Sequence, residues 1–386
     1  MSTAKPRVLL LVNSLAVGGA ETQLVRLALY LHGTGHAVKV ATILPYGRGR
    51  PDLQAAGIPH EVLPLRAPIG GLTLLAGAVR LCRQWKPDVV VSFLFYANLL
   101  GRLAGAFARV PVVISSVRTE RFGGRASDAA LRFTDPLASL TVANCDNTAR
   151  RLAADRIVAK KRLLVIPNGV PLEAFANDYP DRSATRKSLG LSDEDFLWLA
   201  VGHLEPIKDY PTLLKAMTIL RESGLPAKLR IAAEGSQRSY LQGLIRDLQL
   251  SGAVSLLGFR SDVPALLGAA DALVQSSWCE GMPNVVIEAM AAGVPVVATN
   301  RGGTTELIEP GVTGLLVPPR DARALASAMA ELMKLPARQR SDMGAAGCRF
   351  VAERFALDQV MSQWEDLITE LWEARSRRDG RPAESA

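Results

Sequence analysis

The sequence predicts an α/β fold in which two doubly wound domains each contain a parallel sheet. The chain has 386 residues, which exceeds one ordinary hydrophobic core and favours two domains. Short apolar runs recur roughly every 25–40 residues with helical patterns between them, and this alternation is typical of doubly wound units. The runs are continuously apolar, as expected of parallel strands that are covered on both faces.

The apolar runs fall into two sets, one in each half of the chain. The predicted strands of the first half are Val8–Val12, Ala37–Ile43, Val89–Phe93, Val112–Ser115, Leu140–Ala143 and Leu163–Ile166. Those of the second half are Leu197–Val201, Lys228–Ala232, Val254–Leu256, Ala272–Gln275, Val294–Ala298 and Gly314–Val317. Between the two sets the pattern pauses, and the residues from Pro167 to Phe196 are rich in Pro, Asn, Asp and Ser, which is typical of a linker.

The pause sets the predicted domain boundaries. We expect a first domain over residues 1–172 and a second over 173–357. A second polar stretch, Pro336–Asp342, precedes a predicted final helix, Asp358–Arg375, which carries an apolar stripe that includes Trp364. Residues 377–386 are polar, and we expect them to form a disordered tail.

The composition excludes several classes of protein. With 48% hydrophobic and 21% charged residues, the chain is typical of a soluble globular protein. The four cysteines and four histidines are widely spaced and match neither a disulfide framework nor a zinc site. No DxD-type pair of carboxylates stands at a strand end, so no metal is predicted. No apolar run reaches the roughly 18 residues that span a bilayer, and the apolar start is too short for a signal peptide. We therefore expect a cytoplasmic protein.

The charge is uneven along the chain, whose net charge is +8. Residues 1–177 hold 22 Lys and Arg against 10 Asp and Glu, whereas the remainder holds 23 against 27. A basic first half suggests an anionic partner, namely a membrane surface, a pyrophosphate or a nucleic acid; the alternative is a merely basic surface. The basic residues that stand near apolar ones are Arg118, Arg121, Arg125, Arg132, Arg150, Arg151, Arg156, Lys160, Lys161 and Arg162, and their apolar neighbours are Phe122, Leu131 and Phe133.

Two glutamates, Glu280 and Glu288, flank a Gly-Pro-Asn turn in the second half. Pro283 suits the first turn of a helix, which places Glu280 in the preceding loop and Glu288 on the second turn. Ionised carboxylates are rarely buried without partners, so Glu288 needs a hydrogen-bond donor, and a ligand with hydroxyl groups would supply one. The alternative is a solvated Glu280 and a salt-bridged Glu288.

Other candidate residues also follow predicted strands. Gly18 and Gly19 open a predicted helix over Thr22–His32, where free N–H groups suit an anion; a purely structural turn is the alternative, and no dinucleotide-binding fingerprint is present. Lys208 follows the first strand of the second half, where its charge could neutralise a phosphate; the alternative is a solvated lysine at the start of a helix. The backbone around Phe259 could hydrogen-bond the edge of a base.

Taken in order, these motifs resemble one family closely. They read G-G-A-E, I-P-N-G-V, V-G-H-L-x3-K, L-L-G-F, Glu-x7-Glu and T-G-L-L-V. The chain is similar to the retaining, family 4-like glycosyltransferases with the GT-B fold, a large group that includes bacterial polysaccharide and phosphatidylinositol mannosyltransferases. The resemblance spans most of the chain and is strongest from Ile166 to Pro318.

The resemblance implies a fold and a set of roles. It implies two Rossmann-like domains facing a cleft, a final helix at 358–376 that packs back on the first domain, and a nucleotide-diphosphate sugar held mainly by the second. By motif, Glu288 would hold the ribose, Glu280 the donor sugar, Lys208 the diphosphate and the Phe259 backbone the base, while Gly18 and Gly19 would approach the diphosphate or the acceptor. The residues that would line the donor sugar beside Glu280 are Gly281, Met282, Pro283, Asn284 and Val285.

Two residues, His203 and Arg118, stand apart from these assignments. His203 stands in the donor site where the family usually has an arginine, so neutralisation of the diphosphate would rely more on Lys208, and His203 receives no firm role. Arg118 is our candidate for a residue that faces the donor sugar; the alternatives are an ion pair with Glu120 or an arginine that faces a membrane.

The resulting functional prediction is a retaining transferase without a metal or a separate cofactor. It would move a sugar from a nucleotide-diphosphate donor, UDP being favoured over GDP, to a hydroxyl of a lipid-linked saccharide at the inner face of the cell membrane. An anionic membrane surface is a predicted partner, whereas nucleic acid is not, because no recognition fold accompanies the charge. The alternatives are a nucleotide-sugar epimerase and a non-catalytic subunit that binds nucleotide sugars.

Overall fold

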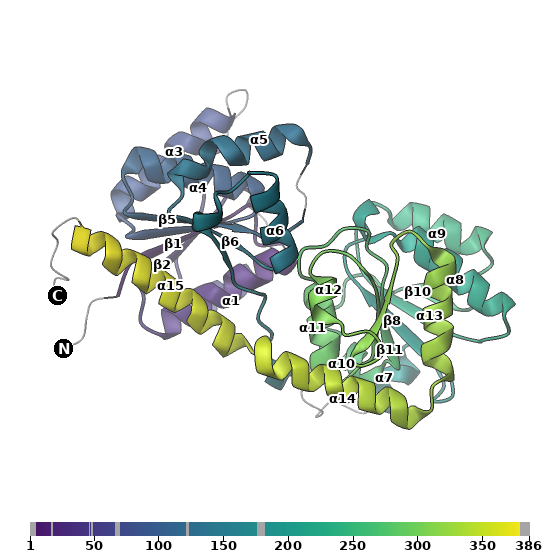
Figure 1. Ribbon diagram of the computed structural model, residues 1–386. Helices are drawn as coiled ribbons and strands as arrows, with labels where there is room; N and C mark the ends of the chain where they lie inside the picture. The colour runs from purple at the N-terminus through teal and green to yellow at the C-terminus, as the bar shows by residue number, and fades with distance from the viewer. Residues whose placement is uncertain are drawn as a thin grey trace. The chain divides into compact units, whose positions relative to one another are not determined.

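The computed structural model describes residues 5–16, 18–45, 47, 49–65, 70–120, 123–175 and 182–378. The chain divides into two compact units (Figure 1). Unit 1 comprises Met1–Gly169 and Asp358–Ala386, and unit 2 comprises Val170–Leu357. The chain therefore leaves unit 1 once and returns to it for its last segment.

Unit 1 contains a seven-stranded parallel sheet with the order β3-β2-β1-β4-β5-β6-β7. Its strands are β1 (Val8–Val12), β2 (Val38–Thr42), β3 (His60–Val62), β4 (Val89–Phe93), β5 (Val112–Val117), β6 (Leu140–Ala143) and β7 (Leu163–Val165). The order reverses between β1 and β4, which is the mark of a doubly wound sheet. The sequence missed β3, because this short edge strand lacks a run of buried apolar residues.

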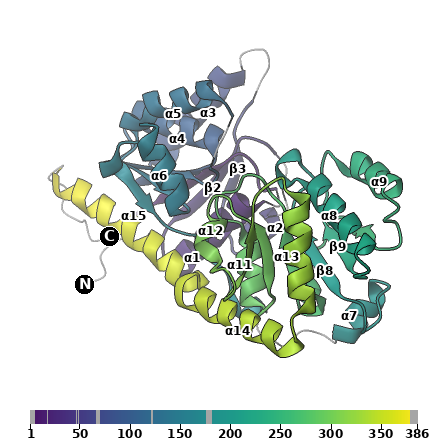
Figure 2. The same ribbon diagram turned by 45° about the vertical axis from the view of Figure 1, so that its right-hand side comes forward.

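Helices cover both faces of this sheet. They are α1 (Gly19–Gly33), α2 (Arg50–Ala55), α3 (Gly70–Trp85), α4 (Phe95–Ala108), α5 (Arg125–Thr134), α6 (Asp146–Ala154) and α15 (Leu357–Arg378), with short 3-10 helices η1 (Asp135–Leu137) and η2 (Lys160–Arg162). Figures 1 and 2 show α3, α4, α5 and α6 on one face of the sheet, and α1 and α15 on the other.

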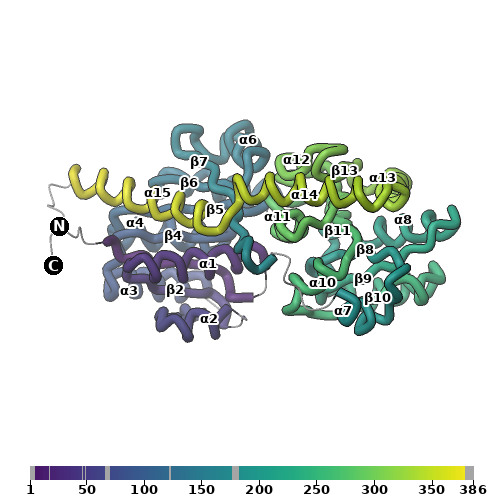
Figure 3. Tube along the Cα trace, turned by 90° about the horizontal axis from the view of Figure 1, so that it is seen from below, coloured from purple at the N-terminus to yellow at the C-terminus, as the bar shows by residue number. Residues whose placement is uncertain are grey.

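The carboxyl-terminal helix α15 packs on unit 1, beside α1 (Figure 3). Trp364 is fully buried and its ring centroid lies 5.6 Å from that of Phe93 at the end of β4. Glu365 accepts from Lys5 at 2.6 Å and contacts buried His36 at 3.1 Å. The helix continues through Arg378, so the prediction that a disordered tail begins at residue 377 is wrong for its first two residues, and the rest of that tail lies outside the described residues.

Unit 2 contains a six-stranded parallel sheet with the order β10-β9-β8-β11-β12-β13. Its strands are β8 (Leu197–Val201), β9 (Lys228–Ala232), β10 (Val254–Leu256), β11 (Ala272–Gln275), β12 (Val296–Thr299) and β13 (Gly314–Val317). The order reverses between β8 and β11. Both sheets therefore confirm the predicted pair of doubly wound α/β domains.

The helices of unit 2 also lie in two layers. They are α7 (Arg182–Ser188), α8 (Tyr210–Glu222), α9 (Arg238–Asp247), α10 (Val263–Ala269), α11 (Asn284–Ala291), α12 (Thr304–Leu307), α13 (Ala322–Lys334) and α14 (Ala337–Arg354), with 3-10 helices η3 (Leu172–Phe175) and η4 (Pro206–Lys208). Figure 1 shows α8, α9 and α13 on one face of the sheet, and α10 and α11 on the other. The polar stretch at 336–342 comprises Pro336, the residue before α14, and the first turns of that helix, which the sequence did not predict.

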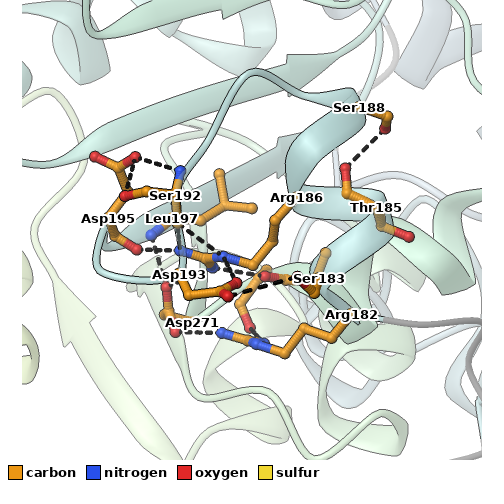
Figure 4. A network of polar contacts seen from close by, with 12 residues as sticks. Arg182, Ser183, Thr185, Arg186, Ser188, Ser192, Asp193, Asp195, Leu197 and Asp271 are labelled. Carbon is orange, nitrogen blue, oxygen red and sulfur yellow. Dashed lines mark hydrogen bonds and ion pairs between the residues drawn. The ribbon is translucent and has the colours of Figure 1, made fainter.

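Arg186, a buried residue of α7, links the loop after this helix to the amino ends of β8 and β11, the two central strands of the unit 2 sheet (Figure 4). Arg186 is fully buried and donates to the carbonyl of Ala269 at 3.0 Å and to Asp271 Oδ2 at 3.2 Å. Asp271 also accepts from Arg182 at 2.6 Å and from the backbone N–H of Leu197 at 2.7 Å. This network lies at the amino ends of β8 and β11, so it supports the fold rather than the candidate site at the opposite edge.

Candidate active site

The candidate site of unit 2 lies where its strand order reverses. In sheets of this kind, ligands bind outside the carboxyl ends of the strands at such a switch point. β8 ends at Val201 and leads through Gly202 into η4, and β11 ends at Gln275 and leads into the loop before α11. These two loops, together with helix α11, carry most of the residues that the sequence singles out.

The structure brings together Lys208 and Glu280, which are far apart in the sequence. Lys208 Nζ lies 2.5 Å from Glu280 Oε1, and both side chains are mostly buried. The same oxygen accepts from Gln275 Nε2 at 3.2 Å, and Gln275 is the last residue of β11. The interpretation of Glu280 as a merely solvated carboxylate is therefore wrong, since it lies at the centre of a polar cluster.

The segment after Glu280 is a tightly supported loop. Gly281, Met282 and Pro283 are buried, and Asn284 and Val285 begin α11 half-buried. Pro283 is the residue before the helix rather than part of its first turn. The loop after β12 packs directly on this segment, because the N–H of Gly303 donates to the carbonyl of Gly281 at 2.5 Å.

Gly302 is required at this contact. Its φ of +54° lies in the left-handed region, and a Cβ at this position would stand 1.9 Å from the carbonyl oxygen of Glu280. A side chain at this position would therefore displace the loop that carries Glu280. The sequence alone does not show what this glycine contacts.

Glu288 lies on the second turn of α11, as predicted, and is half-buried. After Asn284 its helix is otherwise apolar, with Val286, Ile287 and Met290 fully buried. This carboxylate therefore stands one helical turn from the loop of Glu280, at the same edge of the sheet.

Two further predicted residues, His203 and Phe259, and one that the sequence did not single out, Tyr210, follow neighbouring strands. His203 is exposed after β8, and Phe259 is 36% exposed after β10. Tyr210, at the start of α8, is buried, and burial together with the nearby Glu280 charge raises the pKa of its hydroxyl, so it stays protonated. The carboxyl ends of three strands thus contribute to one polar edge.

In unit 1, Gly18 and Gly19 stand at the start of α1 after β1, as predicted. The sequence did not reveal that Glu21 folds back over this helix start. A Cβ on Gly18 would lie 2.3 Å from Glu21 Oε2, and burial raises the pKa of the Glu21 carboxyl. An internal carboxylate therefore already faces the helix terminus that we expected to receive an anion.

Arg118 follows β5 and is only 7% exposed, so the alternative of a membrane-facing arginine is wrong. Its guanidinium carbon lies 4.5 Å from the ring centroid of Phe93 and 6.0 Å from that of Trp364. It donates to the carbonyl of Ile166 at 3.4 Å, whereas its Nε and Nη2 have no hydrogen-bond partner among the described residues. Burial lowers the pKa of Arg118 to about 9.

Clusters of metal-ligating side chains and helices able to span a membrane are both absent from the part of the chain that the structure describes. No group of three or more His, Cys, Asp or Glu side chains there could hold a metal ion. None of the helices within the described ranges is long and apolar enough to cross a membrane.

Two family models match the chain. The model for glycosyl transferases group 1 matches residues 181–349, and the model for glycosyltransferase family 4 matches residues 17–174. Each match falls largely within one of the two units, and together they cover most of the chain.

Three curated relatives illustrate the similarity. An Escherichia coli galactosyltransferase, named for UDP-Gal and α-D-GlcNAc-diphosphoundecaprenol, is 27% identical over 66% of this chain and 68% of its own length. The D-inositol 3-phosphate glycosyltransferase of Mycobacterium tuberculosis is 27% identical over 94% of this chain and 82% of its own length. An exopolysaccharide phosphotransferase of Streptomyces coelicolor is 36% identical over 57% of this chain but only 22% of its own length.

Solved structures share the fold. HepE of Anabaena in complex with UDP-glucose has a TM-score of 0.84 at 24% identity and covers 95% of this chain and 100% of its own. The sucrose-phosphate synthase of Thermosynechococcus elongatus has a TM-score of 0.79 at 19% identity, covering 95% and 100%. With the two family models and the paired doubly wound sheets, these similarities identify the chain as a glycosyltransferase of group 1, with a family 4-like first half and the GT-B fold.

Proposed function

We propose that this protein transfers a sugar, with retention of its anomeric configuration, from a UDP-sugar to a hydroxyl of a lipid-linked saccharide. The observation that carries the proposal is the Lys208–Glu280 pair at the switch point of the unit 2 sheet. It places a cation and a carboxylate beside the start of α11, where a diphosphate and a sugar would meet.

The residues at this edge suit the loss of a diphosphate leaving group. Lys208 would offset the negative charge that grows on the diphosphate as its bond to the sugar breaks. Glu280 would accept hydrogen bonds from sugar hydroxyls, and Glu288 from those of the ribose. The leaving phosphate would take the proton of the attacking hydroxyl on the same face of the sugar, so the protein supplies orientation and charge rather than a nucleophile.

The choice of donor and acceptor is supported by the names of similar proteins. HepE was crystallised with UDP-glucose, and the E. coli relative is named for UDP-Gal and a diphosphoundecaprenol-linked acceptor. The base of the donor would meet the backbone after β10, at Gly258 and Phe259, where Gly258 has a φ of +78°.

We further propose that unit 1 docks reversibly on the anionic inner face of the cell membrane. On its surface Leu72 of α3 is 67% exposed and Phe107 of α4 is 60% exposed, and both line a hollow of about 450 Å³. Arg80 and Arg83 line the same hollow, and cations beside apolar side chains suit an anionic bilayer. We call this set of four residues the α3–α4 surface.

The arginine-rich segment identified from the sequence contributes less to the proposed membrane contact than we expected. Arg118 is buried, and Arg151 is held by Asp128 at 2.6 Å and by Asp155 at 3.2 Å. Arg121 and Phe122 lie outside the described residues. Phe133 of α5 is 81% exposed and remains a candidate for membrane contact.

The experiment that tests the proposal is a transfer assay with labelled UDP- and GDP-sugars and a polyprenyl-diphosphate saccharide acceptor. Product anomeric configuration, read by NMR, should match that of the donor. A donor panel read by thermal shift should favour UDP-sugars, since a ligand at 100 times its Kd stabilises by about 2.7 kcal/mol. Epimerisation of the donor, or binding without turnover, would overturn the proposal.

A further inference from the structure

Three successive carbonyls of η4 accept hydrogen bonds from the segment that follows β11. The indole Nε1 of Trp278 donates to the carbonyl of Pro206 at 3.1 Å. The backbone N–H of Trp278 donates to the carbonyl of Ile207 at 3.1 Å. The hydroxyl of Ser276 donates to the carbonyl of Lys208 at 2.8 Å. Every residue of this short helix is therefore tied across the switch point of the sheet.

The 3-10 helix η4 has little else to hold it. It consists of a single turn, in which the N–H of Lys208 donates to the carbonyl of Glu205 at 2.9 Å and the N–H of Asp209 to that of Pro206 at 3.2 Å, and such turns have poor hydrogen-bond geometry. The next residue, Asp209, adopts a left-handed conformation with φ of +50°, which is strained for a residue other than glycine. The position of Lys208 thus depends on contacts from outside the turn.

Trp278 is itself fixed in place. The guanidinium carbon of Arg320 lies 4.7 Å from the centroid of its ring, which is within the range of a cation–π interaction. Trp278 is only half-buried and belongs to a loop, so packing in the core does not account for its orientation. Its two hydrogen bonds to η4 and the cation on its ring do.

We propose that Trp278, assisted by Ser276, is a positioning residue that holds Lys208 beside Glu280 for glycosyl transfer. It fixes the carbonyls of Pro206 and Ile207, and so the direction in which the Lys208 side chain leaves the backbone. Glu280 follows Trp278 by two residues, so one short segment sets both members of the pair. This inference rests on the proposed role of Lys208 at the donor diphosphate.

The test is Trp278→Phe, which keeps the ring and the backbone N–H but removes the indole donor. We expect kcat to fall about tenfold, since small misplacements at a reacting centre can cost up to a hundredfold. The KM for the acceptor and the melting temperature should stay unchanged. Trp85→Phe is the matched control, because Trp85 is also half-buried under an arginine, with Arg7 at 4.8 Å, but lies in unit 1.

A double-mutant cycle separates positioning from a merely structural role. In a Lys208→Met background, Trp278→Phe should cause no further loss of UDP affinity or of residual turnover, because its effect acts through Lys208. Ser276→Ala should reduce kcat in the same direction. Wild-type kinetics for Trp278→Phe, or an equal loss in both backgrounds, would overturn the inference. If Lys208→Met itself leaves transfer and UDP affinity unchanged, the proposed role of Lys208 fails first and the inference falls with it.

Discussion

Lys208 Nζ and Glu280 Oε1 lie 2.5 Å apart, so the cation and the carboxylate of the candidate site neutralise each other. A diphosphate that reaches Lys208 must compete with Glu280 for it. Glu280 therefore keeps the Lys208 ammonium group in a fixed position, and Lys208 is not left as an isolated charge at the carboxyl ends of the strands.

This competition predicts opposite effects of two substitutions. Lys208→Met should weaken UDP binding by about one to two decades, because it removes a charge-assisted hydrogen bond worth roughly 1.5–3 kcal/mol. Glu280→Gln should leave UDP affinity equal or higher, because Lys208 loses its competitor, while turnover falls. Calorimetry with UDP and steady-state kinetics measure the two effects, and a similar loss of UDP affinity in both variants would contradict this account.

Glu288→Gln tests the ribose contact. The variant keeps the shape of the side chain on α11 but weakens a charge-assisted bond, so donor affinity should fall by about one to two decades. Thermal unfolding should stay near that of the wild type, because Glu288 is only half-buried. Unchanged donor affinity in a calorimeter would remove Glu288 from the site.

Turnover should not depend on a metal ion. The sequence offers no paired carboxylates at a strand end. We therefore expect Lys208 and the start of α11 to offset the negative charge on the leaving group. Excess EDTA should leave the rate largely intact. If activity disappears and returns with Mg²⁺ or Mn²⁺, the site contains a metal that these residues do not account for.

Asp271→Asn tests the network in Figure 4. The change removes the nearer of the two carboxylates that contact fully buried Arg186, leaving Asp193 at 3.8 Å, and removing one partner of a buried ion pair typically costs about 3–5 kcal/mol. The melting temperature should drop markedly while kinetics at low temperature change little. Glu373→Gln is the control, since its exposed pair with Arg377 at 3.5 Å should contribute less than about 1 kcal/mol.

The α3–α4 surface predicts binding to vesicles. Co-sedimentation should increase with the content of anionic lipid and decrease with salt, since exposed charges are screened. Leu72→Asp with Phe107→Asp should abolish it and leave transfer to a soluble acceptor unchanged, whereas Val312→Asp on unit 2 should have no effect. A protein that stays in the supernatant with every vesicle composition would favour a soluble acceptor.

The fold was largely readable from the sequence because parallel strands are buried on both faces and form continuous apolar runs. The exceptions have physical reasons. β3 is half-exposed at an edge, and the strand predicted from Val294 begins only at Val296, since Pro295 has no N–H to donate. The residues of the candidate site followed from their positions after strands.

Contacts between distant segments could not be predicted in the same way. Nothing in the sequence pairs Lys208 with Glu280, or aims the Trp278 indole at η4, since these contacts depend on which strands are neighbours. The burial of Arg118 depends on Trp364, which the chain contributes only after unit 2. The sequence therefore predicted the positions of residues within one strand or helix better than the contacts between residues of different elements.

The return of the chain to unit 1 has a consequence for biosynthesis. The strands of unit 1 are complete long before α15 is made, so the face that Trp364 covers beside Phe93 stays bare while unit 2 emerges. Unit 2 is continuous in sequence and can fold as it leaves the ribosome. We therefore expect the second unit to reach its final state before the first, and nascent chains that stop short of residue 358 to expose an apolar face that chaperones bind.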